Sequence, residues 1–178
     1  MIGRELDAYK FCCAHLKILV LGSYEEPNFS FLEELCRGLK ELGFKSAELV
    51  RNFDTPLKKE EQTEEEYFYI KSCYWIDRVH CWIAVLFGKE FDCGTGTELG
   101  YIFSKHEDRL EDLLIIIKEG IKASRVLIGQ IDYYRKRLTI YHFKNLKEAL
   151  EYCTGFLINV VANKCNEIVV NTSYEWAD

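Results

Sequence analysis

The sequence has no run of apolar residues near the roughly 20 that a membrane-spanning helix needs. Its first 16 residues, MIGRELDAYKFCCAHL, carry acids and lack the continuous apolar stretch of a secretory signal. Basic residues never cluster beyond Arg135-Lys136-Arg137, and the net charge is −6. Because a negative field repels phosphate backbones, we expect no nucleic acid polymer as partner. The missing apolar segments lead us to expect a cytoplasmic protein with no membrane partner.

The sequence also lacks a CxxC pair and any Cys/His spacing typical of a zinc site, although it holds eight cysteines. Cys36, Cys73, Cys81 and Cys153 fall within helical or strand patterns, where a free thiol behaves as a small apolar residue. Disulfides would be expected only in a hyperthermophile, an origin with which one Met and two Gln are compatible. We expect no metal and no cofactor.

Short apolar runs alternate with helical patterns along the chain. Strands are expected at 17–24, 46–53, 80–88, 112–120 and 137–143. Helices are expected at 28–44, 64–79, 123–134 and 144–164, with one more starting near Thr95. This alternation predicts right-handed crossovers and a parallel sheet covered on both faces, which is a three-layer α/β/α sandwich. The expected strand order is the flavodoxin-like 2-1-3-4-5.

The chain length of 178 residues and the 48% hydrophobic content suit one domain with a large core. Neither a linker nor an internal repeat divides the sequence. We therefore expect a single α/β domain with an N-terminal extension at 1–15 and a C-terminal tail at 166–178.

Two loops are expected to meet at one edge of this sheet. In the order 2-1-3-4-5 the ligand crevice opens between strands 1 and 3, at their C-terminal ends. Gly22-Ser23-Tyr24 follows the first of these strands, and the stretch from 88 to 100 follows the other. The sequence therefore places candidate site residues in both loops.

The second loop, FDCGTGTELGYIF, is rich in glycine around acidic residues. We expect Gly94 and Gly96 to adopt positive φ and to admit a ligand close to the backbone. A helix starting near Thr95 would direct free N–H groups into the crevice. Glu98 would then lie in its first turn, where the helix dipole favours an anion.

The pattern Asp92-x-Gly94-Thr95-x-x-Glu98-x-Gly100-Tyr101 resembles the signature of the nucleoside 2-deoxyribosyltransferase family. The resemblance extends weakly from about 17 to 118. It implies cleavage or transfer at an N-glycosidic bond, with Glu98 as the nucleophile that attacks the anomeric carbon. A carboxylate also stabilises the oxocarbenium-like transition state of such a reaction.

Other residues receive roles beside Glu98. Asp92 would protonate the leaving base if its pKa is raised, although a turn or N-cap aspartate is an equally open interpretation. Tyr24 would hydrogen-bond Glu98 across the crevice, or else be a packing residue. Gly22 and Ser23 would line the sugar or phosphate side, beside Gly94, Thr95 and Gly96.

The sequence departs from the family at three places. His80-Cys81 and Phe87 stand where members often carry acids, and the counterpart of a further base-contacting aspartate is not clear, Asp77 being nearest. These departures keep open a second hypothesis, a non-catalytic nucleotide-binding sensor or interaction module. A flavodoxin-like electron carrier ranks last, because the loop after the first strand lacks a phosphate cradle and carries glutamates.

Two further expectations concern the stretch from 58 to 76. The acids before and within EEEYFYIKSCYWI indicate either a cation site or, more simply, a solvated helix start. The aromatic residues of this helix offer more apolar surface than one helix face normally buries. A homodimer or larger even-numbered oligomer is therefore predicted, in line with the family, whose members complete their sites with a neighbouring subunit.

Overall fold

The computed structural model describes residues 2–54 and 63–175. All five of its strands are parallel, in the order β2-β1-β3-β4-β5. They are β1 (Ile18–Leu21), β2 (Ala47–Leu49), β3 (Cys81–Leu86), β4 (Leu113–Lys118) and β5 (Thr139–Phe143). Each lies inside an expected strand, so the predicted fold and strand order are confirmed.

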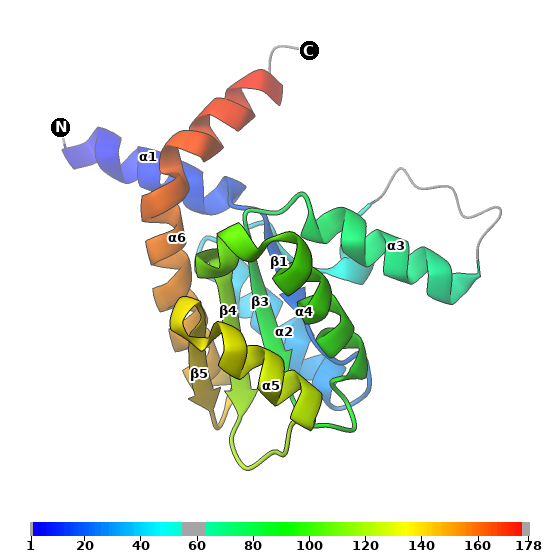
Figure 1. The fold of residues 1–178 in the computed structure, drawn as a ribbon. Helices are drawn as coiled ribbons and strands as arrows, with labels where there is room; N and C mark the ends of the chain where they lie inside the picture. The colour runs from blue at the N-terminus through cyan, green and yellow to red at the C-terminus, as the bar shows by residue number, and fades with distance from the viewer. Residues whose placement is uncertain (1, 55–62, 176–178) are drawn as a thin grey trace.

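Helices cover both faces of the sheet (Figure 1). They are α1 (Ile2–His15), α2 (Asn28–Glu41), α3 (Glu64–Ile76), α4 (Cys93–Lys105), α5 (Arg125–Tyr134) and α6 (Leu146–Glu175). Short 3-10 turns are η1 (Val50–Asn52), η2 (Glu107–Asp112) and η3 (Arg135–Arg137). Helices α1, α2 and α6 pack on one face, and α3, α4 and α5 on the other.

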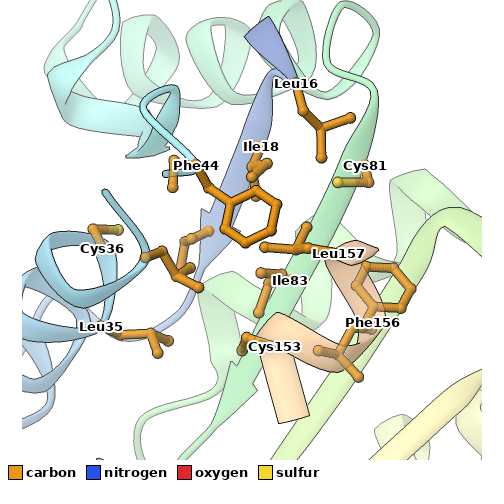
Figure 2. Packing of buried hydrophobic residues seen from close by; sticks show 14 of the residues in the cluster. Leu16, Ile18, Leu35, Cys36, Phe44, Cys81, Ile83, Cys153, Phe156 and Leu157 are labelled. Carbon is orange, nitrogen blue, oxygen red and sulfur yellow. The ribbon is translucent and has the colours of Figure 1, made fainter. Parts of the chain in front are cut away.

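The core consists of two apolar layers separated by the sheet. Because side chains alternate along a strand, Ile18 and Val20 of β1 face the α2/α6 layer, and Leu19 and Leu21 face the α3/α4 layer. Every residue of β1 and β3 is buried, as continuous apolar runs in a doubly covered parallel sheet predict. Figure 2 shows the first layer, where Phe44, Ile83 and Leu157 pack together.

The two ends of the chain form more structure than the sequence patterns indicated. The expected extension at 1–15 contains α1, and the expected tail at 166–178 is helical as far as Glu175, because α6 continues past Asn166. Positions 176–178 lie outside the described residues. Helix α1 packs on this part of α6, with Cys12 Sγ 3.8 Å from the carbonyl oxygen of Cys165 and Ile168 fully buried. The sequence did not predict this helical end because Ile168 packs in a layer shared with α1, at the other end of the chain.

No helix in the described ranges is both long enough and apolar enough to cross a membrane.

Candidate functional site

The chain reverses its direction across the sheet between β1 and β3. These strands are neighbours, with Leu21 in register with Ala84, so the loops after both strands emerge at the same edge. Ligands of open α/β sheets bind at such a switch point. The structure therefore brings together the two loops that the sequence predicted would meet.

Helix α4 begins earlier than expected, at Cys93 rather than near Thr95. Gly94 and Gly96 are helical residues without positive φ, so the expectation of a left-handed loop at these glycines is wrong. The left-handed residue is Gly88, with φ of 128°, which turns the chain directly after β3. A Cβ at Gly94 or Gly96 would meet no heavy atom within 4 Å, so both glycines border open space.

Helix α4 presents three sides. Thr95, Leu99 and Ile102 are buried toward the sheet. Gly94 and Glu98 share a second side, because they are four residues apart in the helix, and this side faces α3. The third side borders a separate cleft of about 320 Å³ toward α5, which Asp92, Cys93 and Gly96 help to line.

A cleft of about 500 Å³ separates α3 from α4. Figure 1 shows α3 beside α4, and the N-terminal end of α3 projects beyond the sheet. The described residues that line this cleft are Glu64, Glu65, Phe68, Tyr69, Ser72, Gly94, Thr97 and Glu98. We call it the Glu98 cleft.

Glu98 is partly buried in the wall of this cleft. Ser72, which is 3% exposed, donates a hydrogen bond of 2.9 Å to Glu98 Oε1. Burial raises the pKa of Glu98 to about 7, and the bond from Ser72 opposes that rise. Because α4 starts at Cys93, Glu98 lies in the second helical turn, so the expected first-turn placement and its dipole stabilisation are corrected.

The opposite wall of the cleft comes from α3, which sequence analysis did not assign to the site. Its N-terminus is closed by a capping box: Thr63 Oγ1 accepts from the Glu66 N–H and Glu66 Oε2 accepts from the Thr63 N–H. This supports the helix-start interpretation of the acids that fall in the described residues. Residues 65, 68, 69 and 72 recur at helical spacing on one side of α3, a sequence pattern that could have indicated this wall. No group of three His, Cys, Asp or Glu side chains among residues 2–54 and 63–175 could hold a metal ion.

Asp92 is not in the Glu98 cleft. Its carboxylate accepts hydrogen bonds from the backbone N–H groups of Phe87 and Gly88, at 2.8 and 2.9 Å, and so closes the loop between β3 and α4. Asp92 precedes α4 but makes no side-chain cap bond to it. Burial raises the pKa of Asp92, and the two N–H groups oppose the rise. The role of proton donor stays a prediction.

Tyr24 makes no hydrogen bond to Glu98. Its ring packs against Phe29 and, edge-on, against Phe68, at centroid distances of 5.7 and 5.4 Å. Within the described residues, its buried hydroxyl has no hydrogen-bond partner. Burial, and then the nearby Glu98 charge, raise the pKa of Tyr24. Tyr24 is thus near enough to Glu98 to feel its charge, and the predicted hydrogen bond is absent.

The remaining predicted residues lie at the same edge but outside the lining of the Glu98 cleft. A Cβ at Gly22 would come 2.9 Å from the methyl groups of Leu32, so this glycine permits close packing of α2. Ser23 is buried, and its hydroxyl oxygen accepts from the Glu25 N–H. Thr95 is 1% exposed, and its hydroxyl makes no hydrogen bond in the part of the chain that the structure describes.

The positions where the sequence departs from the family have structural partners. His80 Nδ1 accepts from the Lys17 N–H at 2.8 Å, and Phe87 packs in the α2/α6 layer. Asp77 lies at the far end of α3, where it accepts hydrogen bonds from Tyr101 Oη and lies 2.8 Å from His106 Nε2. These contacts join the C-terminal ends of α3 and α4.

No protein-family model and no curated protein matches this sequence. The fold does match solved structures. It superposes on a CMP N-glycosidase from Clostridium botulinum, BcmB, with a TM-score of 0.53 and 18% identity, over 79% of this chain and 99% of that one. A conserved protein from Enterococcus faecalis V583 superposes with a TM-score of 0.50 and 12% identity, over 80% of this chain and 99% of that one. At these identities the likeness shows a shared fold.

Proposed function

We propose that the protein cleaves or transfers the N-glycosidic bond of a nucleoside or nucleotide, with Glu98 as the nucleophile. The observation that carries this proposal is the Glu98 carboxylate, held by Ser72 in the wall of a cleft of about 500 Å³ between α3 and α4. The cleft has the size of a small-molecule site.

The arrangement suits attack at an anomeric carbon. The bond from Ser72 to Oε1 fixes the carboxyl group in one orientation and leaves Oε2 for the substrate. Gly94 carries no side chain that would fill the space in front of it. With a pKa of about 7, Glu98 is partly ionised at neutral pH, and the positive charge that develops on the sugar favours the ionised form.

The comparison with BcmB supports the same class of reaction. Its name states that it cleaves the N-glycosidic bond of CMP, and its whole length shares this fold. The motif from Asp92 to Tyr101 points to the same bond from the sequence side. A nucleoside or a nucleotide is therefore the proposed small-molecule partner.

The direct test is release of free base. Purine and pyrimidine nucleosides, deoxynucleosides, their 5′-monophosphates and NAD are incubated with the protein, with and without an acceptor base, and separated by chromatography. We expect at least one to be cleaved and Glu98→Gln to lower kcat by at least about 10³-fold. Cleavage at the parent rate by the variant would sink the proposal.

A binding module without turnover is the second candidate. The observation that favours it is Asp92, whose two carboxylate oxygens are engaged by backbone N–H groups, so the cleft lacks the expected second acid. A nucleotide that raises the melting temperature of both the parent and Glu98→Gln, with no product formed by either, would favour this candidate.

We also propose a homodimer or larger even-numbered oligomer. Helix α3 projects at its N-terminal end, and Tyr69 beside the cleft is 53% exposed. Light scattering at micromolar concentration tests this, and a monomer alone would contradict it.

A further inference from the structure

We propose that the N-glycosides taken by the Glu98 cleft carry a positive charge on the glycosidic nitrogen, as N-ribosylpyridinium nucleosides and N7-alkylpurine nucleosides do. This inference rests on the proposed function and names its substrate class. It follows from which acidic side chains line the cleft and which lie outside it.

The first step concerns the leaving group. A neutral nucleoside releases its base as an anion unless a general acid protonates the base, a contribution of about 10²- to 10⁴-fold. Asp92, the acid expected for that role, bonds to Phe87 and Gly88 and borders the other cleft. Among the described lining residues other than Glu98, Glu64 and Glu65 carry carboxyl groups but are exposed at the entrance of the cleft, and Tyr69, Ser72 and Thr97 offer only hydroxyl groups, which are weak acids.

A cationic N-glycoside does not need that acid. The C1′–N bond breaks with both electrons passing to the ring nitrogen, which leaves as a neutral heteroaromatic base. A lone pair of the Glu98 carboxylate forms the new C1′–O bond. Water then attacks C1′, the bond to Glu98 breaks with its electrons returning to the carboxylate, and one proton passes to solvent. A single carboxylate therefore completes the reaction.

The second step concerns charge at the entrance of the cleft. Glu64 and Glu65, two acidic residues in the first turn of α3, are exposed there. The described lining contains no Lys, Arg or His. Phe68 and Tyr69 supply aromatic faces, which attract a cationic ring system. These groups favour a positively charged ligand over a neutral one.

The experiment compares matched pairs that differ in charge. N-Ribosylnicotinamide is set against cytidine, and 7-methylguanosine against guanosine, each also as its 5′-monophosphate. Base release is expressed relative to uncatalysed hydrolysis, because the cationic compounds are intrinsically more labile. We expect the rate acceleration for the cationic member to exceed that for the neutral one by about 10²-fold or more, the value of a missing general acid. The monophosphate arms show whether a phosphate is tolerated beside the acidic entrance.

A second arm changes the entrance. Glu64→Gln/Glu65→Gln should lower kcat/KM for the cationic nucleosides by roughly 10-fold and leave the neutral ones within about 2-fold. Glu64→Asp/Glu65→Asp keeps the charge and should restore most of the loss, whereas Glu33→Gln on α2, on the other face of the sheet, should change nothing. Equal or greater acceleration of the neutral nucleosides would overturn this inference and leave the proposed function standing. Cleavage of no N-glycoside would defeat both.

Discussion

The Ser72 hydroxyl donates a hydrogen bond of 2.9 Å to Glu98 Oε1, joining α3 to α4 across the wall of the cleft. Ser72→Ala removes a hydrogen bond that favours the ionised carboxylate. We expect the pKa of Glu98 to rise further, so the acidic limb of the pH–rate profile moves to higher pH and kcat falls about 10-fold near neutral pH.

The pKa of Glu98 can be read without turnover, by following its side-chain carboxyl carbon in an NMR titration. Ser104→Ala is the matched control, because Ser104 lies on the exposed side of α4 and donates its hydrogen bond to the Tyr101 carbonyl. An unchanged titration of Glu98 in Ser72→Ala would show that the hydroxyl does not tune the carboxylate.

The partly buried carboxylate of Glu98 should cost stability at neutral pH. Its folded-state pKa of about 7 exceeds the ordinary value of 4.5, so between these values the folded chain binds more protons than the unfolded chain, and stability falls as pH rises. The penalty is absent below pH 4.5 and complete above pH 7, on the order of 3 kcal/mol at most. Glu98→Gln should therefore be more stable than the parent at pH 8 and equal to it near pH 4.5.

Urea denaturation at both pH values measures this difference in the free energy of unfolding. Glu33→Gln, an exposed change on α2, serves as the control and should show no pH-dependent gain. A Glu98→Gln effect of the same size at both pH values would contradict a buried, titrating carboxylate.

Asp92 should be required for stability. Asp92→Ala leaves two buried N–H groups, of Phe87 and Gly88, without their acceptor, a loss of about 2–4 kcal/mol in the free energy of unfolding. Asp132→Ala, which removes an exposed pair with Arg135, should cost less than about 1 kcal/mol.

The same residue separates the two interpretations left open by the sequence. Asp92→Asn keeps one acceptor oxygen, so at a temperature where it is folded it should retain cleavage of any neutral nucleoside that the parent cleaves, since only a neutral nucleoside needs a proton donor for its leaving base. If kcat instead falls by about 10²-fold or more in folded Asp92→Asn, Asp92 acts as the proton donor and the loop role is insufficient.

The sequence predicted the fold and the edge of the sheet that carries the site because both depend on local patterns. Apolar runs such as 18–21 and 81–86 mark buried strands, and the alternation with helices determines the crossovers. That topology also places α3 and α4 on one face. It does not specify which residue of α3 meets Glu98, since the register between two helices depends on tertiary packing. Ser72 was missed for that reason.

The start of α4 was misjudged for a physical reason. Glycine-rich segments before helices often form left-handed turns, and Gly94 and Gly96 were assigned to one. In the structure, the Asp92 carboxylate turns back to the N–H groups of Phe87 and Gly88, and Gly88 supplies the left-handed residue. The chain can then enter the helix at Cys93.

Gly94 and Gly96 form a matched pair that tests which cleft binds the ligand. A Cβ at either position meets nothing within 4 Å, so alanine should stabilise the helix by about 0.5–1 kcal/mol in both variants. Gly94 lines the Glu98 cleft and Gly96 lines the cleft toward α5. We therefore expect Gly94→Ala to weaken ligand binding about 10-fold and Gly96→Ala to leave it unchanged. Both binding affinities are measured by calorimetric titration with an intact nucleoside that the parent cleaves, in a Glu98→Gln background that prevents turnover. Weaker binding in Gly96→Ala alone would place the site on the other side of α4.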